Sequence, residues 1–221
     1  MNMPRGKLNL KKNGIRRFFL NFEELLKKKK KEEDIEHKII NVGLSYIQMK
    51  LPLENLTPQF ISNVQVKVEK NIFHAKIREA KEEDLEIVMQ IYNKAWLTSN
   101  TPFAPITTES LKTIFDFPDT TILIAKVYGI DGGFIMLDLE GPNKEYGIIA
   151  GLGILPRFQR KGLGTVLGMA AWNYFKQKNI KELRCEVYVD NKASYSFIKS
   201  LGFEEYETKT YFKEDFQLGE D

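Results

Sequence analysis

The fold is decided by residues 145–167, which read EYGIIAGLGILPRFQRKGLGTVL. Residues 146–156 are an apolar run interrupted by glycines and ended by Pro156, which is typical of a strand that cannot continue past the proline. After the turn, apolar residues recur at helical spacing, namely Leu163, Val166, Leu167, Ala170, Ala171, Tyr174 and Phe175. The stretch therefore predicts a strand, a tight basic turn and a helix, in that order.

The turn itself, residues 159–165, has the features of an anion-binding site. The first turn of a helix carries unpaired backbone N–H groups and the positive end of the helix dipole. Gly162 and Gly164 allow a ligand to approach this backbone, and Arg160 and Lys161 add positive charge. The chemistry favours a phosphate group as the ligand.

Composition sets broad limits on the protein. The 221 residues suffice for one domain of about 150 residues and an extension. The longest apolar runs fall short of the ~20 residues that a membrane span needs, and no secretory signal pattern is visible. The single cysteine, Cys185, excludes an intramolecular disulfide and fits a reducing compartment. We expect a cytoplasmic protein.

Positive charge is concentrated in the N-terminal arm, residues 1–40. The arm holds 12 Lys and Arg against 6 Asp and Glu, whereas the remainder holds 21 against 24. Within it, residues 14–31 show an apolar helical face and end in a run of lysines. This pattern fits an exposed, solvated helix, and it also fits contact with nucleic acid or an anionic surface.

Two units follow from these patterns. Residues 1–73 are assigned to a basic, partly helical N-terminal extension. Its later part, residues 38–73, alternates apolar and polar residues in places, as in Val64, Val66 and Val68, which is typical of a strand or hairpin added to the main domain. The more regular pattern of the main domain starts at His74 and runs through residues 74–221.

The second unit has a mixed order of strands and helices. We expect strands at 75–80, 121–128, 134–139, 146–156, 183–189 and 203–216, and helices at 82–96, 107–115, 163–175 and 192–201. Asp131-Gly132-Gly133 is predicted as a hairpin turn. The order predicts an α/β (α+β) fold with a central, partly antiparallel sheet of about six to seven strands flanked by about four helices.

Two segments of this unit resemble the GNAT superfamily of acyl-CoA-dependent N-acetyltransferases. Residues 159–164, QRKGLG, fit the family signature Gln/Arg-x-x-Gly-x-Gly/Ala at every specified position. Residues 191–203, NKASYSFIKSLGF, look like the family's Asn-led helix that closes on Leu-Gly-Phe. The resemblance covers roughly residues 74–216. A dinucleotide-binding fingerprint fits less well, because Gly168 lies one residue away from the required position.

The resemblance implies acetyl-CoA as co-substrate and direct acetyl transfer to an amine, without a metal. It implies that backbone N–H groups of the glycine turn bind the pyrophosphate. It also implies that the preceding strand is splayed by a bulge and pairs with the pantetheine arm. The cofactor-binding residues implied in this way are Leu152, Gly153, Ile154, Gln159, Arg160, Lys161, Gly162, Leu163, Gly164, Thr165 and Asn191.

A protonated amine cannot attack a thioester, so the reaction needs a base. Glu145, at the start of the central strand, is the first candidate, and Glu140 and Asp138 are weaker ones. The resemblance implies a tyrosine acid seven residues after the helix-leading asparagine, but this chain has Ile198 there. Tyr195, three residues earlier on a similar helix face, is the candidate substitute.

Acceptor selection is expected in residues 96–105 and 206–216, where Trp96, Phe103, Tyr211 and Phe212 suggest an aromatic cleft. The acceptor is a protein N-terminus, a lysine or a small amine, and the sequence does not choose among them. The departure at Ile198 keeps a second hypothesis open, a non-catalytic acyl-CoA-binding domain tethered by the basic arm. A homodimer is compatible with either.

Overall fold

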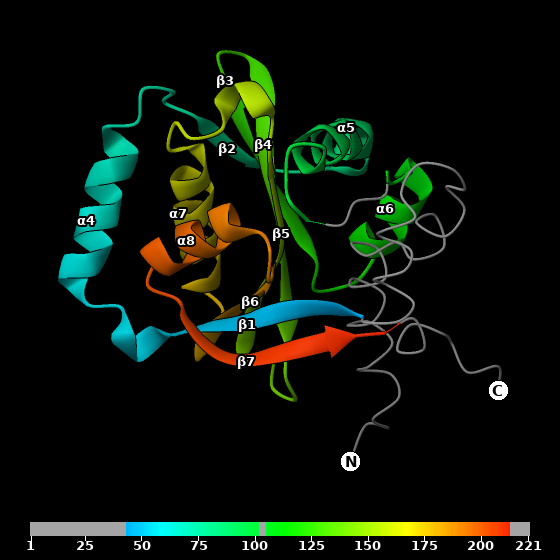
Figure 1. The fold of residues 1–221 in the computed structure, drawn as a ribbon. Coiled ribbons are helices and arrows are strands. Elements are labelled where there is room, and N and C mark those ends of the chain that lie inside the picture. Colours follow the sequence, from blue (N-terminus) through cyan, green and yellow to red (C-terminus); the bar gives the residue numbers. More distant parts are fainter. Residues whose placement is uncertain (1–42, 102–104, 213–221) are drawn as a thin grey trace.

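A computed structural model describes residues 43–101 and 105–212, so the arm of residues 1–40 and Phe103 lie outside it. The described chain forms one seven-stranded sheet in the order β2-β3-β4-β5-β6-β1-β7 (Figure 1). Its strands are β1 Leu44–Pro52, β2 Lys76–Glu79, β3 Thr121–Val127, β4 Ile130–Glu140, β5 Tyr146–Ile154, β6 Glu182–Tyr188 and β7 Glu204–Tyr211. Only β5 and β6 are parallel neighbours. The predicted mixed sheet is confirmed.

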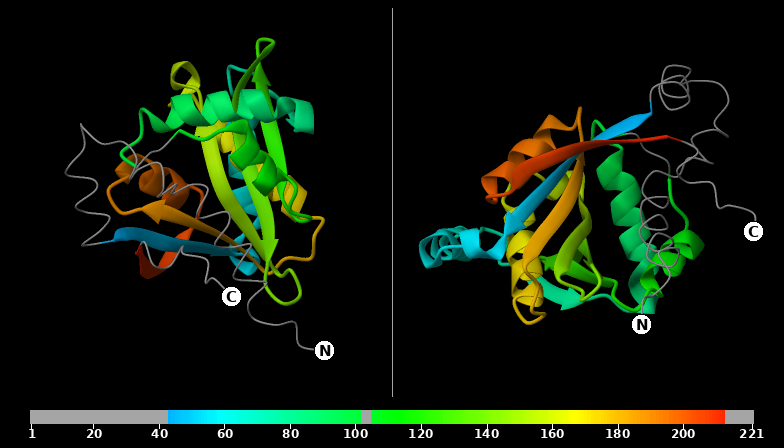
Figure 2. Two further views of the ribbon diagram at one scale, coloured as in Figure 1. Left: turned by 90° about the vertical axis from the view of Figure 1, so that its right-hand side faces the viewer. Right: turned by 90° about the horizontal axis from the view of Figure 1, so that it is seen from below.

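Helices cover both faces of this sheet (Figures 1 and 2). One face carries α4 Pro58–Glu69, α7 Leu163–Phe175 and α8 Lys192–Ser200, and the other carries α5 Leu85–Trp96 and α6 Thr108–Phe115. Short 3-10 helices lie at Leu53–Asn55, Glu82–Asp84 and Pro156–Phe158. Each face has its own hydrophobic core, one centred on Leu167 and Phe175 of α7 and the other on Val88 and Ile91 of α5.

The first described strand, β1, lies inside the sheet and not at its edge. It pairs antiparallel with β6 over residues 46–52 and antiparallel with the last strand, β7, on its other side. Its odd-numbered residues Met49 and Leu51 are buried in the core. Residues 44–52 of the N-terminal extension are thus built into the same sheet as the later unit. The sequence division at residue 73 stays a prediction about organisation.

Two local predictions are corrected by the structure. Residues 58–69 form helix α4 and no strand or hairpin, because the Thr57 side chain caps the Phe60 N–H and Pro58 occupies the first helical turn. The hairpin between β3 and β4 turns at Tyr128 and Gly129, both with positive φ, and not at residues 131–133.

Strands β5 and β6 are neighbours at one end only. Their parallel pairing runs from Tyr146–Glu182 to Ile149–Cys185, and beyond this point the two strands separate. On its other side, β5 follows β4 to the end, but the register shifts so that Leu137 pairs with Ile149 and Met136 with Gly151. One residue, Ala150, is left over as a bulge at the start of the separation. The predicted bulge and splay are therefore present at this place.

We predict that the buried side of β1 is required for stability. Met49 is 0% exposed and belongs to the core, so replacing it by Ala leaves a cavity and should lower the free energy of unfolding by about 2–5 kcal/mol. Lys50→Ala, on the opposite face of the same strand, is the control and should cost less than about 0.5 kcal/mol. Urea denaturation measures both. Equal effects would contradict the placement of β1.

Candidate active site

A pocket with a volume of about 650 Å³ begins where β5 and β6 separate. It is lined along one wall by the second half of β5, along another by the second half of β6, and at its two ends by the glycine turn before α7 and by β1. Trp96 of α5 and Asn191 of α8 contribute to the remaining sides. The pocket is thus one continuous space between a helix N-terminus and the face of strands β6 and β1.

The glycine turn forms one end of this pocket. Arg160 and Gly162 both adopt left-handed backbone conformations, with φ of +57° and +83°. Gly162 is the N-cap of α7, and it supplies no side-chain cap for the first-turn N–H groups of the helix. Gly164 and Thr165 also line the pocket. This end therefore offers backbone donors and a helix dipole to an anionic ligand.

Of the remaining predicted residues of the turn, Gln159 lines the pocket, whereas Lys161 and Leu163 do not. The Gln159 amide donates to the Ile154 carbonyl at 2.8 Å and to Thr98 Oγ1 at 3.2 Å, so it fastens the turn to the end of β5. Leu163 is buried in the core. Lys161 Nζ donates to the carbonyl of Arg157 at 3.0 Å, and neither Lys161 nor Leu163 is a lining residue.

Strand β5 supplies the middle of the pocket. Leu152 and Ile154 line it, together with Ala150 and Gly151 beside the bulge. Gly153 does not, because its Cα faces the ring of Phe134, which a Cβ would approach to 2.5 Å. Since β6 has turned away here, the main chain of this half-strand has an edge toward the pocket that β6 does not pair.

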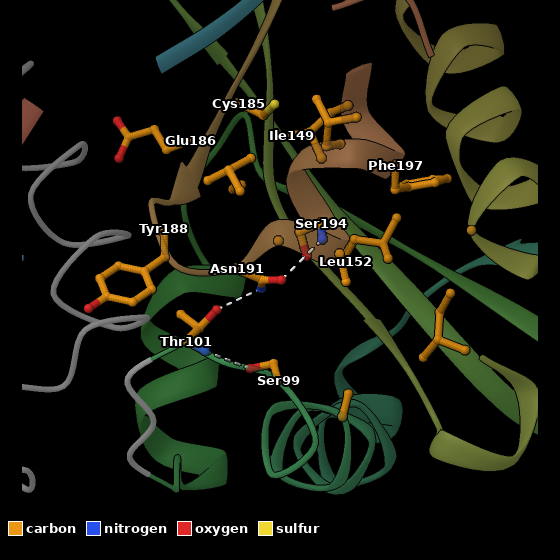
Figure 3. A pocket seen from close by; sticks show the side chains of 18 of the residues that line it. Ser99, Thr101, Ile149, Leu152, Cys185, Glu186, Tyr188, Asn191, Ser194 and Phe197 are labelled. Carbon is orange, nitrogen blue, oxygen red and sulfur yellow. Dashed lines mark hydrogen bonds between the residues drawn. The ribbon is translucent and has the colours of Figure 1, made fainter. Parts of the chain in front are cut away.

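Asn191 lies where β6 ends and α8 begins (Figure 3). Its Oδ1 accepts from the Ser194 N–H at 3.0 Å, and its Nδ2 donates to Thr101 Oγ1 at 2.8 Å. The first contact makes Asn191 the N-cap of α8, and the second links α8 to the segment after α5. Asn191 also lines the pocket, so its predicted role at the ligand stays open.

The opposite end of the pocket is lined by residues 184–188 of β6 and by Tyr46 and Gln48 of β1. Figure 3 shows Glu186 and Tyr188 on one side of β6 and Cys185 on the other. In the strand register Gln48 pairs with Glu186, and Tyr46 pairs with Tyr188. All four line the pocket, and the Tyr211 hydroxyl donates to Glu186 Oε1 at 3.0 Å. A carboxylate held by a tyrosine and flanked by polar and aromatic side chains thus faces the space.

Two tyrosines of this end have raised pKa values. Burial, with a smaller contribution from the nearby Glu186 charge, raises the pKa of Tyr46 well above its usual value. Burial also raises the pKa of Tyr188. Burial also raises the pKa of the Cys185 thiol, which packs in the core and borders the pocket.

Neither predicted catalytic residue is brought to the pocket. Glu145 lies in the turn before β5, where hydrogen bonds from its own N–H and that of Asn143 lower its pKa, with the first the larger cause. The Tyr195 hydroxyl donates to Glu205 on the exposed side of α8. The weaker candidate Glu140 does line the pocket, whereas Asp138 does not. Ile198 lines it as a buried apolar residue.

Sequence reasoning missed Glu186, Gln48 and Tyr46. The alternation in residues 182–188 was a usable signal, because it places Glu186 and Cys185 on opposite faces of one strand. Nothing in the sequence showed that residues 44–52 lie beside this strand. Of the predicted aromatic residues, Trp96 lines the pocket and Tyr211 holds Glu186, while Phe212 is largely exposed.

Within residues 43–101 and 105–212, no three or more His, Cys, Asp or Glu side chains come together as a metal site. No helix in those ranges combines the length and the apolarity that crossing a bilayer requires.

The sequence model of the acetyltransferase (GNAT) family matches residues 85–203. An N-alpha-acetyltransferase of Sulfurisphaera tokodaii is 28% identical over 66% of this chain and 88% of its own length. An aminoglycoside N(6')-acetyltransferase type 1 of Acinetobacter haemolyticus is 35% identical, over 30% of this chain and 46% of its own length. A mycothiol acetyltransferase of Renibacterium salmoninarum is matched over only 18% of its length.

Solved structures show the same fold at low sequence identity. The PaiA N-acetyltransferase of Thermoplasma acidophilum, solved with coenzyme A, superposes with a TM-score of 0.53 and 22% identity over 62% of this chain and 99% of that one. The ribosomal-protein-S18-alanine N-acetyltransferase of Escherichia coli gives a TM-score of 0.51 and 18% identity over 60% and 79%. With the family match spanning more than half of the sequence and including the strand, glycine turn and helix that form the pocket, this chain belongs to the GNAT family of acetyltransferases.

Proposed function

We propose that this protein transfers the acetyl group of acetyl-CoA to an amine, with the cofactor and the acceptor entering opposite ends of the one pocket. The observation that carries the proposal is the continuity of that pocket. It leads from the uncapped N-terminus of α7, past the separated strands, to the carboxylate of Glu186. The edge of β5 thus connects an anion-binding end with a carboxylate that can act as a base.

At the cofactor end, backbone N–H groups of residues 160–165 are proposed to bind the pyrophosphate, including those of Lys161 and Leu163, whose side chains point elsewhere. The main chain of residues 152–154 would pair with the pantetheine arm. Support comes from the edge that β5 presents after β6 has diverged. Asn191 would limit the space beside the arm, because hydrogen bonds from Nδ2 to Thr101 and from the Ser194 N–H to Oδ1 hold its side chain in place.

At the acceptor end, we assign the role of base to Glu186 in place of Glu145. Glu186 lines the pocket directly beyond the point where β5 and β6 part, and Tyr211 fixes its carboxylate. In the reaction Glu186 first removes one proton from the ammonium group, and the neutral amine then forms a bond to the acetyl carbonyl carbon. The carbon–sulfur bond breaks, and the second proton that leaves the nitrogen goes to solvent. Backbone donors near the bulge at Ala150 would stabilise the charge on the carbonyl oxygen.

The departing thiolate needs no tyrosine at position 198. Ile198 is apolar and buried, and so has no proton to give. A thiol has an ordinary pKa of about 8.5, so its thiolate leaves more readily than an alkoxide or amide would. The proton held by Glu186 or one from solvent then restores the thiol. The alternative of an acyl-CoA-binding domain without catalysis rested on this missing acid, and the placement of Glu186 reduces its support.

The acceptor end favours a cationic amine on a slender arm. Tyr46 and Tyr188, with ring centroids 5.5 Å apart, provide aromatic faces, and Glu186 provides the opposite charge. A protein N-terminus, a lysine and a small amine all meet this description. A cytoplasmic location, a homodimer and contact of residues 1–40 with nucleic acid or an anionic surface stay predictions.

Replacing Gly162 by Val should weaken acetyl-CoA binding at least about 10-fold, because a Cβ there meets Asn71 Nδ2 at 2.5 Å and φ is +83°. Isothermal titration calorimetry measures the dissociation constant. Gly129→Val is the control, since Gly129 has a similar φ of +81° but no atom within 4 Å of a Cβ. An unchanged affinity in the Gly162 variant would remove the phosphate-binding assignment.

Replacing Glu186 by Gln should lower kcat/KM for the amine by about 10²–10⁴-fold near neutral pH. The defect should shrink as the pH rises toward the amine pKa of about 10, because a growing fraction of the amine is then already neutral. The pH dependence of the defect is tested by measuring initial rates of thiol release from about pH 6.5 to about pH 10 with about a dozen amines. A defect independent of pH would argue against a base.

Glu145→Gln and Tyr195→Phe are matched controls that remove the two groups favoured by the sequence. Since neither lines the pocket, each should leave kcat/KM within about 3-fold of the wild-type value. A loss as large as that of Glu186→Gln in either variant would reinstate the earlier assignment.

A further inference from the structure

Asn71 is a buried polar residue whose side chain reaches the glycine turn from a distant part of the chain. It lies two residues after α4 and is 8% exposed. Its Nδ2 donates to the carbonyl oxygen of Lys161 at 2.8 Å, and its Oδ1 accepts from the N–H of Phe73 at 3.0 Å. The second bond fixes the orientation of the amide, so the first is directed at the turn.

The bond to Lys161 orients the peptide that joins it to Gly162. In a trans peptide the C=O and the following N–H point in opposite directions, and the described chain has no cis peptide. With the Lys161 carbonyl turned toward Asn71, the Gly162 N–H is turned away from Asn71. Gly162 itself lines the pocket at the end where a phosphate is expected.

The same contact accounts for the residue type at Gly162. A Cβ at this position would come within 2.5 Å of Asn71 Nδ2. The glycine therefore makes room for Asn71 as well as for a left-handed backbone. Helix α4, which Asn71 follows, packs on α7, which Gly162 precedes, and this packing supports the close approach of Asn71 to Gly162.

We propose that Asn71 is a positioning residue for the CoA pyrophosphate, acting through the Lys161–Gly162 peptide without touching the ligand. The proposal rests on the proposed function of the pocket. It predicts that loss of the Asn71 donor weakens binding of the pyrophosphate alone, because the peptide can then rotate and its N–H no longer has a fixed direction. The thioester end lies outside its influence.

The test is Asn71→Asp, which keeps the shape and the acceptor for Phe73 but replaces the donor by an oxygen that repels the Lys161 carbonyl. With acetyl-CoA, kcat/KM should fall about 10- to 100-fold, the scale of one hydrogen bond to a charged group, through KM and with kcat nearly unchanged. With acetyl-pantetheine, which lacks the pyrophosphate, kcat/KM should equal that of the wild type.

Two variants keep the comparison clean. Asn63→Asp makes the same chemical change on the exposed face of α4 and should behave as wild type with both thioesters. Asn71→Ala removes the donor without adding charge and should repeat the selective loss, which also covers the case in which Asn71→Asp does not fold. Thermal unfolding of each variant reports stability separately.

An equal loss with both thioesters would overturn the proposal, because it would mark Asn71 as a general structural residue. Unchanged kinetics with acetyl-CoA would overturn it too. These outcomes differ from failure of the proposed function, in which the wild-type protein neither binds acetyl-CoA in calorimetry nor releases thiol with any amine. That result would remove the basis of both proposals.

Discussion

The structure depends on the hydrogen bonds that β1 makes on both of its sides. Strand β6 must leave β5 after Cys185 to open the pocket, and it loses a neighbour on that edge. It can do so because its other edge is paired with β1 along residues 182–188. Strand β7 in turn is joined to the sheet through β1. Strand β1 therefore stabilises both β6, where it borders the pocket, and the edge strand β7.

This support comes from a segment that precedes the family-matched residues 85–203. The same segment contributes to both ends of the pocket. Through β1 it lines the acceptor end with Tyr46 and Gln48, and through the chain after α4 it holds the glycine turn with Asn71. The glycine turn and the strand at the other end of the pocket thus belong to different parts of the sequence but share one framework.

The order of elements from β2 to β7 could be predicted because each rests on local signals. Periodicity marked α5 and α7, and residues 159–164 and 191–203 marked the two ends of the cofactor side. Pairing between distant strands leaves no such local signal. The position of β1 beside β6 was therefore not predicted, and the sequence favoured Glu145, which lies outside the pocket, over Glu186, which lines it. In α4, valines two residues apart outweighed the Thr57-Pro58 start signal, which was the better guide.

The central position of β1 also has a consequence for how the chain is made. Ser45 and Thr210, whose hydroxyls lie 2.8 Å apart in the finished sheet, are separated by 165 positions in the sequence. A ribosome releases β1 early, while the strands on either side of it are among the last to be synthesised. Both edges of β1 stay unpaired until β6 and β7 have been synthesised, and contacts between residues so far apart in the sequence form slowly. The nascent chain is therefore most exposed to mispairing and aggregation at the very strand that completes its catalytic pocket.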